Sequence, residues 1–241
     1  MTDPNRRGPR PETIAEREWL AALRGAARGS GWGQKQGALF RQEGAWFVAG
    51  HLRMLTTPDG PRPHAEILAK PMALDPLYWR DMSLSENARQ PLSFRYWGAF
   101  VCGTPVLDVR ALPADDDAET RAAALIAALD AMLPDLMVRL AEVPFSTLAA
   151  DPKGAHDNWR MGQTLLYAHE LERNGPALRA QAERMAEGDQ GGPMVVVNIA
   201  PGVAETRLLA ETVLGRLDAD AARPAARRAW WQRLFGHHDG A

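Results

Sequence analysis

In residues 45–70, side chains of different character alternate at every second position on either side of a turn. This alternation constrains the fold more than any other feature of the chain. In the segment 45–56, one face carries Trp46, Val48, Leu52 and Met54, and the other carries Phe47, Ala49, His51, Arg53 and Leu55. A period of two residues is that of a β-strand. The turn sequence TPDGPRP at 57–63 follows, and 64–70 repeats the alternation. We therefore predict a β-hairpin here.

Two further segments extend this hairpin into a sheet. Residues 35–41 have strand character and are joined to the hairpin by a turn at 42–44. Residues 92–102 alternate aromatic and other side chains, which predicts a fourth strand. Because the connections between successive strands are short, we expect an antiparallel meander of about four strands.

Helical periodicity surrounds the predicted sheet. The first helix is predicted at 12–28, and the chain becomes helical again after Leu112, where Asp115, Asp116 and Asp117 precede a helix start. An antiparallel helical hairpin is predicted around Asn174, and residues 194–200 are either a strand or a buried connector. We predict an α+β protein with a flexible arm at 1–11, a helix and sheet at 12–112, helices packed on the sheet at 113–219 and a basic, aromatic tail at 220–241.

Composition narrows the class of protein. The net charge of −2 excludes a global attraction to nucleic acid, and no apolar run approaches the ~18–20 residues that span a bilayer. The single cysteine, Cys102, excludes a disulfide framework and favours a reducing compartment, and the N-terminus has no apolar signal segment. Only three of the basic residues are lysines, a ratio typical of GC-rich bacterial genomes. We expect a cytoplasmic protein.

Motifs for catalysis and cofactor binding are missing from the sequence. There is no Gly-x-Ser-x-Gly nucleophile elbow, and the glycine-rich stretch 29–37 lacks the spacing of a phosphate loop. Cys102 lies in an apolar segment, as a core thiol does. His156 and His169 are about 140° apart around one helix and cannot share a metal. We predict no catalytic residue, no metal and no cofactor.

The candidate site is an area of the sheet. In simple register, polar side chains of three predicted strands meet on one face: His51, Arg53, His64, Glu66, Lys70, Arg95 and Trp97. Such a face could hold a partner protein through arginine and tryptophan anchors. It could also be an ordinary outer face, bare to solvent or covered by the C-terminal helices. As the alternative function, His51, Arg53, His64 and Arg95 would bind a small anionic ligand, with histidine as general base.

The stretch KPMALDPLYW, residues 70–79, predicts a corner. Lys70 ends a strand at the rim of the polar face, and Pro71 removes a ladder donor. Asp75 is predicted as a helix N-cap with Pro76 at the first helical position, so that Trp79 turns into the core. Of these residues, only Lys70 is a candidate for function.

The tail has a composition suited to a second interaction. Basic and aromatic residues interleave there: Arg227, Arg228, Trp230, Trp231 and Phe235. Such a segment binds acidic lipid or a partner groove, or docks as a helix on its own domain, and we favour docking or partner binding.

Two stretches carry a family resemblance. HAEILAKPMALDPLYW, residues 64–79, resembles the strand and corner of small bacterial α+β families that include immunity proteins of polymorphic-toxin systems. TLLYAHELERNGPALRAQAERM, residues 164–185, is similar to a tetratricopeptide-like helix pair. The missing catalytic motifs, the Arg/His/Trp-bearing sheet face and the basic, aromatic tail together predict a non-catalytic cytoplasmic module that binds a protein partner and is able to form a homodimer. The resemblance adds toxin immunity or bacterial defence as its setting.

Overall fold

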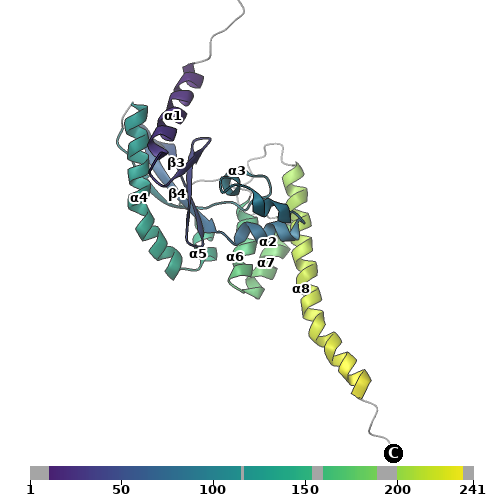
Figure 1. Cartoon of the computed structure of the whole chain (residues 1–241). Helices are drawn as coiled ribbons and strands as arrows, with labels where there is room; N and C mark the ends of the chain where they lie inside the picture. The colour runs from purple at the N-terminus through teal and green to yellow at the C-terminus, as the bar shows by residue number, and fades with distance from the viewer. Residues whose placement is uncertain (1–10, 115–116, 154–159, 189–199, 236–241) are drawn as a thin grey trace, which may run out of the picture.

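The computed structural model describes residues 11–114, 117–153, 160–188 and 200–235, with the side chains of 11–14, 200–204 and 223–235 outside that description. The predictions for the N-terminal arm and for the segment 194–199 fall outside the described residues. So do the predicted roles of the tail side chains Arg227, Arg228, Trp230, Trp231 and Phe235. Within the described part, a helix, an antiparallel sheet and a helical C-terminal half follow one another, which confirms the α+β class (Figure 1).

The sheet is an antiparallel meander in the order β1-β2-β3-β4-β5. Its strands are β1 Gly33–Lys35, β2 Ala38–Glu43, β3 Trp46–Thr57, β4 Gly60–Pro71 and β5 Val106–Ala111. The predicted hairpin is confirmed as β3 and β4, and the predicted faces are confirmed as well. Val48, Ile67 and Ala69 belong to the main core, whereas Phe47 and Leu68 belong to a small cluster on the opposite, outer face.

The prediction of a strand at 92–102 is wrong. The fifth strand is β5, and the segment before it forms the short helix α3, Phe94–Trp97, followed by an extended stretch. The amides of residues 94–98 bond to carbonyls three or four residues earlier. The carbonyls of Arg95 and Cys102 and the Cys102 amide bond to buried side chains far away in the sequence instead of to a neighbouring strand. Backbone N–H and C=O groups can be satisfied either in a β-ladder or by bonds outside one. The alternation of aromatic side chains is compatible with both arrangements.

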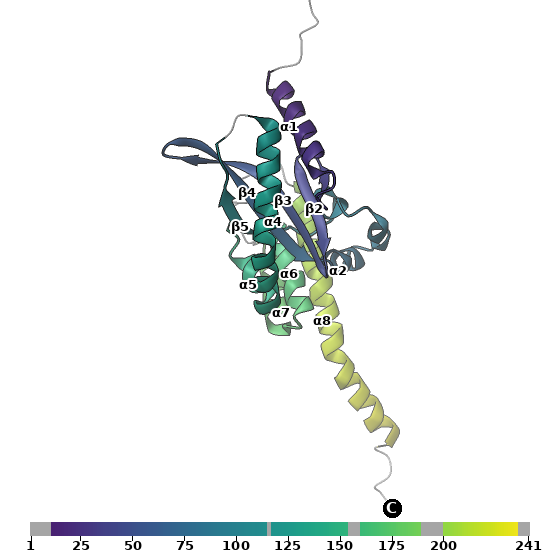
Figure 2. The same cartoon turned by 60° about the vertical axis from the view of Figure 1, so that its left-hand side comes forward.

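Two long helices cover the inner face of the sheet. α1, Pro11–Ala27, packs along α4, Ala118–Glu142, and α4 lies against β3, β4 and β5 (Figures 1 and 2). α4 comes unusually close to β3 at Gly50, where an added Cβ would lie 2.4 Å from a methyl carbon of Leu129. As the sequence predicted, acid precedes this helix: the carboxylate of Asp117 accepts a hydrogen bond from the Thr120 amide and caps it.

The remaining helices pack around the end of the sheet where β4 stops. They are α2 Leu74–Asp81, the 3-10 helix η1 Ser85–Arg89, α5 Phe145–Ala150, α6 Met161–Leu171, α7 Gly175–Ala186 and α8 Ala200–Phe235. The predicted helical hairpin is confirmed as α6 and α7, with Asn174 capping α7. Ala200, the last residue of the predicted segment 194–200, lies in α8 rather than in a strand.

Ionic contacts attach the first half of α8 to this group of helices. Arg216 on α8 bonds to Glu170 on α6 at 2.7 Å, and Arg80 on α2 bonds to the same carboxylate at 3.0 Å. The second half of α8 extends away from the body (Figures 1 and 2).

Candidate functional site

The hairpin β3–β4 brings together four of the predicted site residues. His51 lies opposite Glu66, and Arg53 lies opposite His64, on the outer face of the sheet. Glu66 Oε2 is 2.8 Å from His51 Nε2, and Glu66 Oε1 is 3.5 Å from a guanidinium nitrogen of Arg53. Glu66 is almost completely buried, so its carboxylate is stabilised by these two contacts rather than by water.

Tyr96 extends this cluster. Its hydroxyl oxygen is 3.2 Å from His51 Nδ1, which places the imidazole between a carboxylate and a phenol. In a neutral imidazole one nitrogen donates and the other accepts. A neutral His51 that donates from Nε2 to Glu66 accepts the Tyr96 hydroxyl at Nδ1. Burial, and secondarily the charge of Glu66, raises the pKa of Tyr96 to about 12.

A predicted consequence concerns stability in alkali. An unfolded tyrosine loses its proton near pH 10, whereas Tyr96 in the folded state keeps it to about pH 12. The unfolded state therefore binds fewer protons between these values, and stability falls as the pH rises. Tyr96→Phe should lose about 1 kcal/mol less stability than the wild type between pH 9 and pH 11, measured by urea unfolding. Equal losses in the two proteins would show that Tyr96 titrates normally.

The prediction that Lys70 lies at the rim of the polar face is wrong. Lys70 is completely buried at the end of β4. Its ammonium donates to Asp75 Oδ1 at 2.8 Å and to the carbonyl oxygens of Arg95 and Cys102, each at 2.7 Å. An ammonium has three donors, and all three are used here. The candidate role of Lys70 in function is therefore replaced by a structural one.

Asp75 is the centre of this buried network and not a helix cap. α2 begins at Leu74 without a side-chain cap, and the Asp75 carboxylate accepts from the amide of Cys102 at 2.9 Å and from the guanidinium of Arg95 at 3.0 Å. Arg95 also donates to the carbonyl of Met72 at 2.9 Å. Arg95 is thus directed to α2, whereas the other three basic residues of the predicted anion site, His51, Arg53 and His64, lie together on the hairpin.

The network shapes the segment 94–102, which we call the aromatic loop. Lys70 bonds to carbonyls near both ends of it, and the Trp79 indole donates to the carbonyl of Phe100 at 2.6 Å. Trp79 is buried in the core, as predicted. Trp97 donates from its indole to the carbonyl of Lys35 on β1 at 3.2 Å, so the loop crosses the outer face to the far edge of the sheet.

Two aromatic side chains of this loop are exposed. Trp97 is 43% exposed and Phe100 is 37% exposed. Phe100 has a φ of 57°, in the left-handed region that a bulky residue rarely occupies. The sequence analysis drew attention to Trp97 but not to Phe100. Sequence analysis did not assign Asp75, Tyr96 or Phe100 to the site. The only signal of the network in the sequence is Lys70 followed closely by Asp75, which lies between two prolines.

Cys102 does not supply a nucleophile at this surface. The thiol is buried, and burial raises its pKa well above the usual value, with the charge of Asp75 acting in the same direction. The thiolate is the reactive form of cysteine. Cys102 is therefore an inert core residue, as its apolar neighbours in the sequence indicated.

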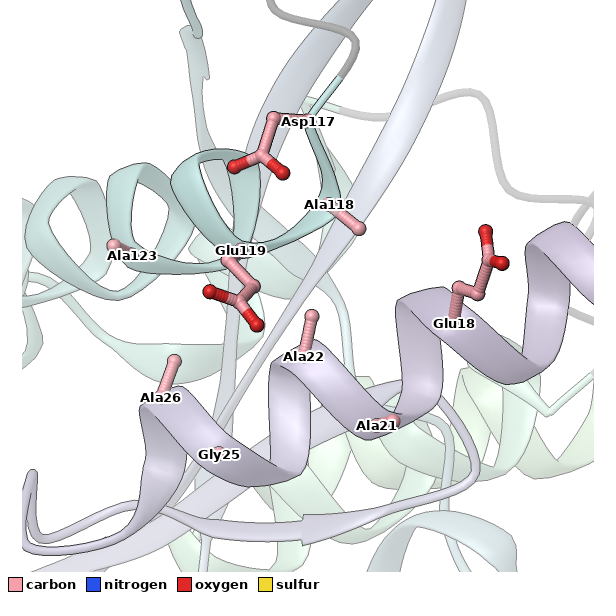
Figure 3. Close-up of a pocket in the computed structure, with 9 residues that line it drawn as sticks. All are labelled: Glu18, Ala21, Ala22, Gly25, Ala26, Asp117, Ala118, Glu119 and Ala123. Carbon is pink, nitrogen blue, oxygen red and sulfur yellow. The ribbon is translucent and has the colours of Figure 1, made fainter.

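A groove of about 790 Å³ lies elsewhere, between α1 and the start of α4 (Figure 3). Small residues line its floor, and its charged lining residues are the acids Glu18, Asp117 and Glu119. A second, largely apolar groove of about 460 Å³ lies beside Trp46 and Phe145. No residue of the predicted sheet-face site lines either groove, and the acidic one does not suit an anionic ligand.

Among the described residues, no group of three or more His, Cys, Asp or Glu side chains could hold a metal ion. No helix in the same part of the chain is long and apolar enough to cross a membrane.

Comparisons with known proteins find no matching family model, no similar curated protein and no similar solved structure.

Proposed function

We propose that the protein is a non-catalytic binding or accessory module that holds a protein partner on its aromatic loop. The observation that carries the proposal is the combination of exposed Trp97 and Phe100 with a loop fixed from beneath by a buried ion pair. Tryptophan is among the residues most enriched in binding hot spots. A loop held in one conformation loses little entropy when a partner binds.

The backbone of Phe100 supports the same proposal. A non-glycine residue in the left-handed conformation costs roughly 1–2 kcal/mol. Such strain persists only when the surroundings impose it, and it collects at functional sites. Here Trp79 and Lys70 bond to the carbonyls of Phe100 and Cys102. The ring that this conformation presents is partly open to solvent rather than used in the core.

The polar part of the outer face supports binding over catalysis. Both ring nitrogens of His51 are engaged, by Glu66 and Tyr96, and the Arg95 guanidinium is engaged by Asp75. A general base or an anion clamp needs such groups directed at a ligand. Arg53, about a third exposed on the same outer face, instead suits the polar rim of a protein interface. A role in toxin immunity or bacterial defence, in the cytoplasm, is the setting we propose.

Affinity purification from the native host, with mass spectrometry of what is retained, tests the proposal through two variants. Trp97→Ala should lower the affinity for the retained protein at least tenfold, as for a hot spot worth about 2 kcal/mol. Phe100→Gly should weaken binding as well and yet keep or raise the melting temperature, because glycine relieves the positive φ. Val138→Ala, at a 56% exposed position on α4, is the matched control and should bind like the wild type.

Opposite results would contradict the proposal. If Phe100→Gly melts several degrees lower, its ring serves the core rather than a partner. If both loop variants retain the partner as the control does, the binding surface lies elsewhere. Recovery of a small anion in place of any protein would favour the ligand-binding alternative.

A further inference from the structure

The tip of the β3–β4 hairpin has an unpaired edge. β3 continues to Thr57, but β2 pairs with it only as far as His51, where Ala38 begins β2. Residues 52–57 therefore pair with β4 on one side and with no described strand on the other. Figure 2 shows the hairpin projecting past the strands on either side of it.

Two hydrogen bonds show which backbone groups point outward from the hairpin. The Met72 amide donates to the carbonyl of Ala45 at 2.8 Å, so odd-numbered residues of β3 exchange hydrogen bonds with β4. The even-numbered Leu52, Met54 and Thr56 must then direct their amides and carbonyls away from β4. On the opposite side, the Leu112 amide donates to the carbonyl of Pro63 at 2.8 Å, which confirms that Pro63 faces outward from β4.

The two edges of the tip are protected differently. Pro61 and Pro63 occupy outward positions on β4, where proline removes the donors that another strand would need. β3 has no proline from Trp46 to Thr57. Its edge therefore keeps every donor, a condition that natural sheets normally prevent on a free edge.

The side chains at this edge are compatible with a second copy of themselves. Met54 is 50% exposed, and no acidic residue lies between 52 and 57. The one charged residue, Arg53, contacts Glu66 on β4, on the side away from the open edge. In an antiparallel pair centred on Met54, Leu52 faces Thr56 and Arg53 faces Leu55 of the other copy. No charge then lies directly opposite a like charge.

We propose that two copies of the chain associate by pairing their β3 edges antiparallel about Met54. The interface is isologous, and the proline-bearing edge of β4 cannot extend it, so the assembly closes as a dimer rather than growing into a fibre. The contact comprises only the tips of two ribbons. It is smaller than a standard interface, and the dimer is weak and depends on concentration. This dimer does not rest on the function proposed for the aromatic loop.

Sedimentation velocity of the full chain over a wide concentration range tests the association. The wild type should shift toward the dimer mass as concentration rises. Thr56→Pro, which removes one outward donor, and Met54→Lys, which places like charges opposite each other, should each weaken dimerisation at least tenfold. Val138→Lys, at an exposed position on α4, is the matched control for added charge and should dimerise like the wild type.

Cross-linking tests the register. Met54→Cys places the two thiols opposite each other, so a short bis-maleimide should join the copies efficiently. Asp59→Cys, at the exposed turn, places them ten positions apart, about 33 Å, and should not cross-link. Cys102 is buried and should not react. A wild type that stays monomeric, equal cross-linking at both positions, or a dimer lost in Trp97→Ala but kept in Met54→Lys would overturn the proposal.

Discussion

Asp75→Ala should lower the free energy of unfolding by about 3–5 kcal/mol, because it leaves the Lys70 ammonium buried without a counter-ion. Both side chains are fully buried, and Nζ of Lys70 is 2.8 Å from Oδ1 of Asp75. The substitution also removes the acceptor for the Cys102 amide and for Arg95. An unsatisfied buried group retains its full desolvation cost, so these losses add to that of the ion pair.

Asp59→Ala is the matched control in urea unfolding. Asp59 also forms an ion pair, with Arg62, but the side chains are 79% and 51% exposed. Exposed pairs contribute about 0–1 kcal/mol, so this variant should unfold close to the wild type. A second test replaces both partners, as Lys70→Met with Asp75→Leu. The double variant should be less destabilised than the sum of the two single changes, since neither charge is left alone. Similar losses of unfolding free energy for Asp75→Ala and Asp59→Ala would mean that the buried ion pair stabilises the protein no more than an exposed one.

The same network connects stability with the proposed function. Lys70 and Asp75 bond to backbone groups of Arg95 and Cys102, near the two ends of the loop that exposes Trp97 and Phe100. A buried ion pair is weak evidence for stability by itself, but it can impose one conformation on the groups around it. Loss of Asp75 should therefore release the aromatic loop and weaken partner binding even in molecules that remain folded.

The sequence predicted the hairpin and its faces well because a period of two residues leaves little freedom. Once 45–56 and 64–70 are strands joined by a tight turn, His51, Arg53, His64 and Glu66 must lie on one face. The register of β3 and β4 then places His51 opposite Glu66 and Arg53 opposite His64. The same reasoning correctly separated Val48, which lies in the main core, from Phe47 on the opposite face.

Prediction failed where side chains satisfy the backbone. Lysine after an apolar strand normally marks the solvent rim, and nothing local in the sequence indicates that Lys70 finds three buried acceptors. Two of those acceptors lie 25 and 32 residues further along the chain. Strand propensity at 92–102 reflected the aromatic side chains. This segment instead bonds locally in α3 and, at Arg95 and Cys102, to the side chains of Lys70 and Asp75.

The second large effect on stability is expected where α4 meets the inner face of the sheet, opposite the candidate face. At Gly50, one residue before His51, an added Cβ would lie 2.4 and 2.6 Å from the two methyl carbons of Leu129. Leu129 is fully buried and cannot swing into solvent. Gly50→Ala should therefore destabilise the protein by about 1–3 kcal/mol through overpacking, and Leu129→Ala by about 2–5 kcal/mol through the cavity that it leaves.

The two changes should compensate when combined, because the methyl group added at residue 50 occupies part of the space that Leu129 vacates. A double-mutant cycle by urea unfolding should give a total loss at least 1 kcal/mol smaller than the sum, roughly as for residues in direct contact. Gly25→Ala on α1, where an added Cβ meets nothing within 4 Å, is the matched control and should be neutral or stabilising. Strict additivity at Gly50 and Leu129 would show that α4 is not seated on β3 at this point. The position of His51 against Glu66 and Tyr96 would then not depend on the packing of the inner face.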